Sequence, residues 1–441
     1  MTNDRGVPIK ALDSRANWAK AARAAIDESE LAELCMAATD IPSPTGAERE
    51  LAETLGHWMR GAGLDSKVQL IDERQANLVT RVGTNGPGVQ LLLLAPLDTA
   101  FIPGPEDAAW IGELPRPDFA LPSCRDGDRI IGLGAENPKA FAVCALATAL
   151  AVHRVGIPLA GELVVGLVGG SMPTLGSPLS SRRNIGLGVG TAFLLDHGVQ
   201  PDAAIVLKPG YHVVHEEVGF AWFRVTVGGS VGYTGSRHKG EYRNAVVAAA
   251  RVASALEDWF AEYTARNSSG QVAPQGAVTA IHGGDQSKPA FNPASCEFMV
   301  DLRVSPRTSL ADVTAQLTEV ITVLRASQPD VSIDLELLAG QPGTSTPSDS
   351  WVVRRLTSAW EDVEGRPHQS GLPGSGMSDG GVLRRSGVPT ARIGLPPPVE
   401  PGPYQGFSMG VADPAGMSRL VDLLIRTVID VTTRTRKELE D

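Results

Sequence analysis

The sequence predicts an α/β protein of two domains: a larger domain with a mixed, mostly parallel sheet packed between helices, and a smaller inserted domain. Three observations predict it. The length of 441 residues exceeds what a single hydrophobic core usually serves. Apolar runs with strand character alternate with helical patterns in the first half of the chain. In the second half the order becomes β-α-β-β-α-β, which is typical of a ferredoxin-like module.

The first half supplies most of the larger domain. Apolar residues recur at helical spacing over residues 18–38 and again from about 47 to 62, with a Pro- and Gly-containing loop between them. The apolar run 89–95 ends in a loop that carries Asp98, as expected at the carboxyl edge of a buried parallel sheet, where α/β enzymes place their sites. Further strands are predicted over 77–82, 161–169 and 202–207, and a buried helix over 141–155.

The inserted domain is predicted over residues 215–340. The larger domain consists of the segments before and after it, residues 1–214 and 341–441. The predicted strands of the inserted domain cover residues 220–228, 276–282, 296–304 and 331–338, and its helices cover 244–263 and 309–327. The last segment supplies a helix from residue 350, the segment 371–394 and a terminal helix from about 414 to 438. Gly186–Gly190 is interpreted as a glycine-rich helix start, since the full dinucleotide-binding pattern is missing.

Composition excludes several classes of partner. The net charge is −11 and no Lys/Arg stripe appears, which argues against nucleic acid and anionic membranes and favours a small molecule. The four cysteines form no metal-binding spacing and are expected to be reduced. The N-terminus has no apolar signal core, and no apolar run approaches the length of a membrane span, so a cytoplasmic location is expected.

Seven motifs, in order, resemble those of one enzyme family. They are LLLLAPLDTA for a strand followed by GHxDTV, IIGLGAENPKA for GRGxxDxKG, GVGTAFLLDHG for GxGAxxLLxxG, PDAAIVLKPG for PDxAIVxEPT, GSVGYTGS…YRNAV for GxxxHxS…xxNAI, FNPASCEFMVDLRVSP for NxxPxxxxxxxDxRxxP, and GSGMSDGGVLRRSGVPTARIG for GGGTDARxLxxxGIPTxxxG. The chain, from about Ala21 to Arg434, therefore resembles the di-zinc metallopeptidase family that contains acetylornithine deacetylase, succinyl-diaminopimelate desuccinylase, aminoacylase and glutamate carboxypeptidase. The resemblance implies a phosphorylase/hydrolase-like larger domain.

The chain departs from this family at the metal ligands. The family's reaction uses two metal ions that share a carboxylate and activate a water molecule. Of the equivalent positions, at most Asp98 keeps a side chain that binds zinc, so no metal and no cofactor are expected. The first histidine ligand falls on Pro96, the bridging aspartate on Asn137, and the glutamate pair of catalytic base and ligand on Gly169–Ser171. The next carboxylate ligand falls on Lys208 and the last histidine ligand on Tyr404. The histidine that the inserted domain lends to the active site falls on Tyr233.

The positions that contact substrate in the family are better retained. The resemblance implies substrate-binding roles for Asn244, Arg303, Ser378 and Asp379, with Asn137 facing the same cleft. A guanidinium fork such as that of Arg303 suits a carboxylate. The alternative is local: Asn244 caps the helix that follows it, and Arg303 pairs with a nearby acid.

Asp98 and Lys208 allow two interpretations. They form an ion pair that fills the former metal site, or they belong to a metal-free acid/base site together with Tyr233 and Tyr404. The second interpretation predicts condensation, cyclisation, elimination or isomerisation of an amino-acid-like compound, including amine–carbonyl chemistry, in a specialised biosynthetic pathway.

Two other functions stay open. One is a non-catalytic relative of the enzymes that binds a carboxylate ligand or a partner. The other is an amide hydrolase with an unrecognised metal, for which His212, His215 and Glu216 are the nearest candidate ligands. The resemblance also implies a homodimer formed through the inserted domain.

Overall fold

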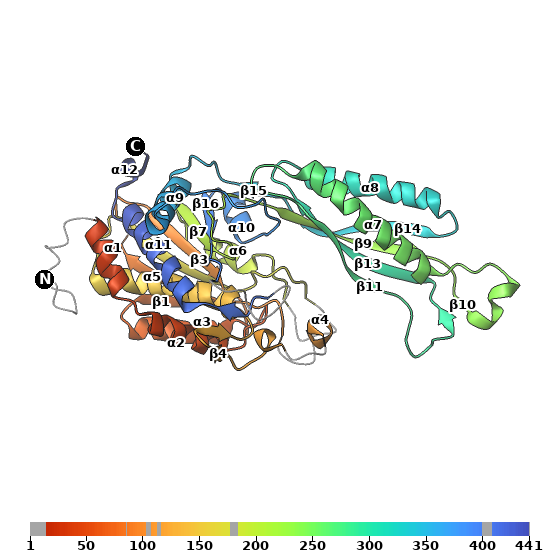
Figure 1. The fold of residues 1–441 in the computed structure, drawn as a ribbon, viewed down its shortest axis with the longest axis horizontal. Coiled ribbons are helices and arrows are strands. Elements are labelled where there is room, and N and C mark those ends of the chain that lie inside the picture. Colours follow the sequence, from red (N-terminus) through yellow and green to blue (C-terminus); the bar gives the residue numbers. More distant parts are fainter. Residues whose placement is uncertain are drawn as a thin grey trace. The chain divides into compact units, whose positions relative to one another are not determined.

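A computed structural model describes residues 15–84, 86–102, 107–112, 116–176, 184–398 and 408–440. The chain forms two compact units (Figure 1). Unit 1 comprises residues Met1–His215, Thr346–Ser370 and Ser378–Asp441, and unit 2 comprises Glu216–Ser345 and Gly371–Met377. The short segment from the last third of the chain thus joins unit 2.

Unit 1 is built on a six-stranded sheet in the order β1-β2-β6-β3-β7-β16. The pairs β6–β3, β3–β7 and β7–β16 are parallel, whereas β1–β2 and β2–β6 are antiparallel. The predicted mixed, mostly parallel sheet is therefore confirmed. Its strands are β1 (Asp65–Leu70), β2 (Ala76–Gly83), β3 (Gln90–Pro96), β6 (Glu162–Val168), β7 (Ala203–Leu207) and β16 (Thr390–Ile393).

Helices cover both faces of this sheet. The larger core packs α1, α2, α3, α5, α9 and α11 against one face, and α6 and α10 contribute Leu194 and Leu383 to a smaller core on the other. The bounds of the helices are α1 (Arg15–Ala24), α2 (Glu28–Thr39), α3 (Arg49–Gly61), α4 (Ala108–Ile111), α5 (Phe141–Val155), α6 (Val189–Asp196), α9 (Trp351–Glu364), α10 (Gly380–Arg385), α11 (Pro414–Thr432) and α12 (Arg436–Glu440). Small strands β4 (Cys124–Asp126), β5 (Arg129–Ile131) and β17 (Val411–Ala412) form a separate sheet.

Two expectations about helices need correction. The single helix expected over 18–38 is two helices, because Asp27 accepts a hydrogen bond from the Ser29 N–H at 3.0 Å and starts α2. The terminal helix is likewise divided into α11 and α12. The helical stretch Ala135–Val155 is long and apolar enough to cross a membrane by length and composition alone, but 89% of its apolar window is buried, as in a core helix.

Unit 2 has the predicted ferredoxin-like order. Its antiparallel sheet runs β11-β13-β9-β14, and helices α7 and α8 pack on the core that this sheet forms. Alternating burial along β9 and β13 directs one set of side chains to that core. The elements are β9 (Gly219–Gly228), α7 (Ala245–Asn267), β11 (Gly276–His282), β13 (Ser295–Val304), α8 (Leu310–Ser327) and β14 (Ser332–Gln341), with the short strands β8 (Glu216–Glu217), β10 (Gly232–Tyr233), β12 (Phe291–Asn292) and β15 (Thr344–Ser345).

Candidate functional site

The candidate site lies at the carboxyl edge of the parallel strands of unit 1. Strands β6, β3 and β7 are neighbours in the sheet, and Ser171, Asp98 and Lys208 follow their respective ends. Parallel strands end at one edge, so residues far apart in the sequence meet there. The sequence predicted this location for Asp98 and Lys208.

Asp98 is completely buried, with no exposed surface. Its Oδ1 accepts a hydrogen bond from the Ser171 N–H at 2.9 Å, and its Oδ2 accepts from the Met172 N–H at 2.9 Å and the Thr45 hydroxyl at 2.8 Å. Burial raises the pKa of this carboxyl group, against the opposing effects of the Met172 N–H and of the positive charge on Lys208. Asp98 is therefore a buried acid that three hydrogen bonds hold in place, two of them from backbone N–H groups.

Lys208 is 6% exposed and lies close to the same loop. Its Nζ is 3.8 Å from the Met172 Sδ, and its charge acts on the Asp98 carboxyl group. An ammonium group thus occupies the region where the resemblance implies a metal ligand, and a nearby cation opposes the binding of a dication.

Two buried charged residues complete this cluster and were not singled out from the sequence. Lys139, in the turn Ala135–Ala140 that precedes α5, donates to the Ile41 carbonyl at 3.1 Å and to the Ser43 hydroxyl. Burial lowers the pKa of Lys139 to about 7, although the charges of Asp98, Cys35 and Glu48 act in the opposite direction. The lysine of the GRGxxDxKG pattern was the available sequence signal.

Glu48 is the second of these residues. Its Oε1 accepts hydrogen bonds from the N–H groups of Gly46 at 2.8 Å and Gly170 at 2.9 Å. Burial, and after it the Asp98 charge, raises the pKa of Glu48 to about 8. No sequence pattern marked Glu48, because it comes from a loop whose proximity to β3 and β6 arises only in the folded chain.

The loop after β6 connects these carboxylates. Three consecutive backbone N–H groups, of Gly170, Ser171 and Met172, donate to Glu48 and Asp98. The Ser171 hydroxyl donates to Asp379. The resemblance implies a glutamate pair here, but this loop presents backbone donors instead of acidic side chains. The loop is therefore held in place by carboxylates of the chain itself.

Asp379 belongs to the same buried network. It is 2% exposed; in addition to the bond from Ser171, its Oδ1 accepts from the Thr191 hydroxyl at 2.8 Å. The neighbouring Ser378 accepts a hydrogen bond from the Gly380 N–H at 3.1 Å through its Oγ. These contacts fix the start of α10, and a substrate-binding role for either residue stays a prediction.

Asn137 and Glu136 lie in the turn before α5. The Asn137 Nδ2 contacts the Met409 Sδ at 3.4 Å, and its buried Oδ1 has no hydrogen-bond partner within the described ranges. Both backbone N–H groups donate to the Met409 carbonyl, at 3.0 Å from Glu136 and 3.1 Å from Asn137. Burial raises the pKa of Glu136 to about 7, so this edge contains a carboxyl group that titrates near neutrality.

The remaining predicted residues are in unit 2 or outside the description. Asn244 accepts hydrogen bonds from the N–H groups of Val246 and Val247, at 3.0 and 3.3 Å, and so caps α7. Arg303 pairs with Asp301 at 2.8 Å. These are the local alternatives to substrate binding. Tyr233 is 49% exposed, with its ring centroid 5.3 Å from that of Phe291. Tyr404 lies outside the described residues.

The residues present do not fit two metal ions. Within the ranges that the structure describes, no group of three or more His, Cys, Asp or Glu side chains is placed to hold a metal. His215 contacts the Thr346 carbonyl through Nδ1 at 2.9 Å, and Glu216 pairs with Arg307. At the carboxyl edge, the ammonium group of Lys208 adds positive charge beside Asp98, so the donor set differs from that of a di-metal site in both type and charge.

The fold thus combines a mixed α/β domain with an inserted ferredoxin-like domain. Residues 215–326 match the model of the M20 peptidase dimerisation domain. The fold is similar to that of a tripeptidase from Staphylococcus aureus, at 17% identity over 93% of this chain and 100% of that chain, with a TM-score of 0.64. The chain therefore has the scaffold of the M20 family peptidases, as its motifs predicted.

Two dipeptidases show the same likeness. Human carnosine dipeptidase 1 is 11% identical over 95% of this chain and 99% of that chain, with a TM-score of 0.70. The dipeptidase Dug1p of Saccharomyces cerevisiae is 11% identical over 94% of this chain and 99% of that chain, with a TM-score of 0.71. At these identities the likeness defines the fold, and the chemistry has to be argued from the site.

Proposed function

We propose that the protein is a metal-independent enzyme that acts on an amino-acid-like small molecule by acid/base chemistry at the carboxyl edge of unit 1. The supporting observation is the cluster of two buried lysines and two buried carboxylates, Lys139, Lys208, Glu48 and Asp98, in the region that holds metal in the implied family. Perturbed titratable groups gather at functional sites more often than elsewhere.

Lys208 is the group proposed to react. A lysine at such a position carries a proton or, as a neutral amine, attacks a substrate carbonyl to form an imine with loss of water. Asp98 is fully buried, so it is proposed to act through Lys208, as its charge partner or proton acceptor, instead of touching substrate. Tyr233 and Tyr404 stay in the proposal as proton-relay residues, and Asn137, Ser378, Asn244 and Arg303 as contacts to substrate. The tripeptidase and dipeptidases of the same fold support a substrate with amino-acid parts.

A ligand-binding protein without catalysis is the second candidate. It is favoured by the loop after β6, where Gly170, Ser171 and Met172 donate to carboxylates of the chain. Donors that are already satisfied do not stabilise a negative charge that develops on a substrate. In this case the cluster is a structural ion network.

Turnover by chelator-treated protein tests the proposal. We expect the protein, dialysed against EDTA, to convert at least one member of a panel of amino acids, N-acyl amino acids, dipeptides and 2-oxo acids, followed by NMR. Lys208→Met should lower the rate by about 100-fold or more, the usual scale for an acid/base group. Lys20→Met on α1, an exposed lysine of the same unit, serves as the matched control and should leave the rate unchanged.

The outcomes separate the candidates. Conversion that appears only after zinc is added contradicts metal independence. Saturable binding of a panel member with no conversion supports the ligand-binding protein. Conversion that Lys208→Met leaves unchanged removes Lys208 from the mechanism.

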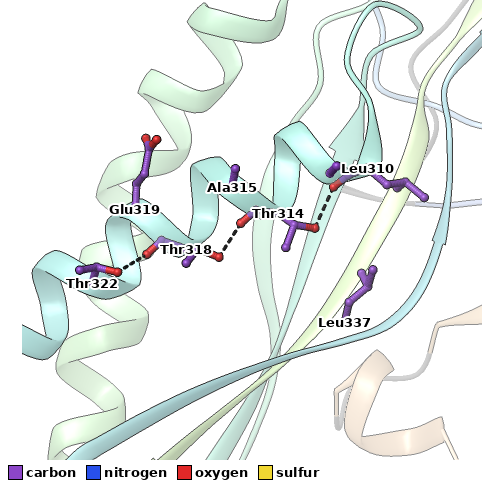
Figure 2. A pocket seen from close by; sticks show the side chains of 8 residues that line it. Leu310, Thr314, Ala315, Thr318, Glu319, Thr322 and Leu337 are labelled. Carbon is purple, nitrogen blue, oxygen red and sulfur yellow. Dashed lines mark hydrogen bonds between the residues drawn. The ribbon is translucent and has the colours of Figure 1, made fainter.

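We also propose that two copies pair through a surface made by α8 and β14 of unit 2, called here the α8–β14 surface. Figure 2 shows Thr314, Thr318 and Thr322 along α8, where each hydroxyl donates to the carbonyl four residues earlier at 2.7, 2.7 and 2.8 Å. These hydroxyls are satisfied within the helix, so the surface is more apolar than its composition suggests. The groove has a volume of about 770 Å³ and is lined by Leu310, Ala311, Thr314, Ala315, Thr318, Glu319, Thr322 and Leu337.

Two further observations favour a second copy as the occupant of this groove. Strand β14 is an edge of the four-stranded sheet, and an edge strand presents hydrogen-bonding groups to another chain. The match to a peptidase dimerisation domain covers α8 up to its penultimate residue and ends before β14. A self-complementary surface of this kind closes a dimer about a two-fold axis.

A further inference from the structure

Unit 2 contains a second cavity, and one of its lining residues, Asn244, is also a proposed substrate contact. It has a volume of about 360 Å³ and lies between the start of α7 and the segment that follows α8. Three arginines and one acid, Asp330, contribute the charges of its lining. The lining residues are Arg237, Tyr242, Arg243, Asn244, Val247, Ala248, Arg251, Ser327, Gln328, Pro329, Asp330 and Val331.

Two of these arginines keep their charge available. Arg243 pairs with Glu241 at 2.6 Å. In contrast, neither Arg237 nor Arg251 makes an ion pair with another residue of the described chain. Isolated arginines on a surface are common, but two that line one concave site raise the local positive potential together.

An aromatic ring holds one of these arginines in place. The Arg237 guanidinium lies over the Tyr242 ring, with its carbon 4.9 Å from the ring centroid. This cation–π contact restrains the guanidinium, and Arg237 makes no ion pair within the described part of the chain. The site thus has a partly ordered donor before any ligand binds.

The start of α7 adds a favourable field. This helix has 23 residues, and its N-terminus carries a partial positive charge. Asn244 accepts from the N–H groups of Val246 and Val247, so the helix end contributes its field rather than these two donors. Direct hydrogen bonds to a ligand therefore come from the arginines.

We infer that this cavity binds a small dianion whose charge is carried on carboxylate or phosphate oxygens. Two guanidinium forks match two charged oxygen groups, and arginine binds both chemistries through paired N–H donors. The volume is at the small end of the range for ligand pockets, which favours a compact metabolite over a macromolecule. The lining keeps a net positive charge, because Asp330 is one acid against three arginines. Near Asp330 itself, a ligand with further negative charge is disfavoured.

Binding of two probe anions to the full-length protein tests this inference. We expect saturable binding of succinate or inorganic phosphate, measured by calorimetry at low ionic strength and weakened by added NaCl. The double variant Arg237→Ala/Arg251→Ala should raise the Kd about tenfold or more, because it removes two charge-assisted donors. Arg266→Ala, in the last turn of α7, is the matched control and should change the Kd less than about twofold.

Each outcome decides the inference. Succinate binding without phosphate binding identifies a carboxylate site, and the reverse identifies a phosphate site. The absence of saturable binding of both anions to the wild-type protein overturns the inference, as does equal weakening by Arg266→Ala and by the double variant. Because Lys208 is not used, failure here leaves the proposed enzymatic function untouched.

Discussion

At the scale of single residues, titratable side chains of both kinds are buried together inside unit 1. Lys139 and Lys208 lie among Glu48, Asp98 and Asp379, all nearly without exposed surface. Burying one such charge alone costs several kcal/mol, so each depends on the others and on backbone donors. The titration of this cluster should therefore appear in the stability of the whole unit.

Replacement of Glu48 tests this coupling. The folded protein holds the proton of Glu48 up to about pH 8, whereas the unfolded chain releases it near the ordinary glutamate pKa of 4.5. The stability that this proton provides is fully present below pH 4.5, the pKa of the unfolded chain. It decreases above that pH and is lost once the pH has risen through about 8, the pKa of the folded protein. The unfolding free energy of the wild type relative to Glu48→Gln should thus fall by about 1 to 3 kcal/mol between about pH 5 and about pH 8.5.

Urea unfolding at the two pH values measures this difference. Glu50→Gln, at an exposed position on α3, is the control and should show no pH-dependent difference. If the difference in unfolding free energy between the wild type and Glu48→Gln is the same at both pH values, Glu48 is ionised in the folded protein over this whole pH range.

At the scale of elements, a few side chains decide where helices begin. Asp27 and Asn244 each start a helix by accepting backbone N–H groups, and Ser309 forms a reciprocal capping box with Asp312 at the start of α8. These caps explain the division between α1 and α2, which apolar periodicity alone did not show. Asn244 is also a predicted substrate contact, so its two roles need separate measurement.

Substitution of Asn244 separates the roles. Asn244→Ala should lower the unfolding free energy by about 1 kcal/mol, because the cap of α7 is lost, whereas Asn244→Asp should keep it. Thermal or urea unfolding gives the stability, and steady-state kinetics with a substrate from the panel gives kcat and KM. A raised KM in Asn244→Asp despite normal stability indicates a contact with substrate beyond capping.

At the scale of the whole molecule, the fold followed from the sequence more fully than the site did. Continuous apolar runs fixed the central strands, whereas β1 is too polar and β16 too short to stand out. Asp98 and Lys208 could be predicted to lie at one edge of the sheet, because each follows a strand and the carboxyl ends of parallel strands share an edge. Glu48 and the three N–H donors of the β6 loop were missed, since no spacing in the sequence reports contacts between distant loops.

The proposed assembly is tested by changing the α8–β14 surface. Ala315→Arg places a charge and a long side chain in the groove and should convert a dimer to a monomer, measured by light scattering or sedimentation. Ala261→Arg, an exposed position on α7, is the control and should leave the assembly unchanged. A wild-type protein that is monomeric at all concentrations, or a dimer that Ala315→Arg leaves intact, excludes this surface as the interface.

The backbone at Gly170 limits which side chains the loop after β6 can carry. Its φ is +63°, and a Cβ built there would lie 2.4 Å from Val189 Cγ1 and 2.7 Å from Gln75 Nε2. A glutamate at this position would be strained and would compete with Glu48 for space and charge. An acidic side chain at this position would thus require accompanying changes at Val189, Gln75 and Glu48, so main-chain geometry as well as side-chain identity separates this loop from one that carries an acid.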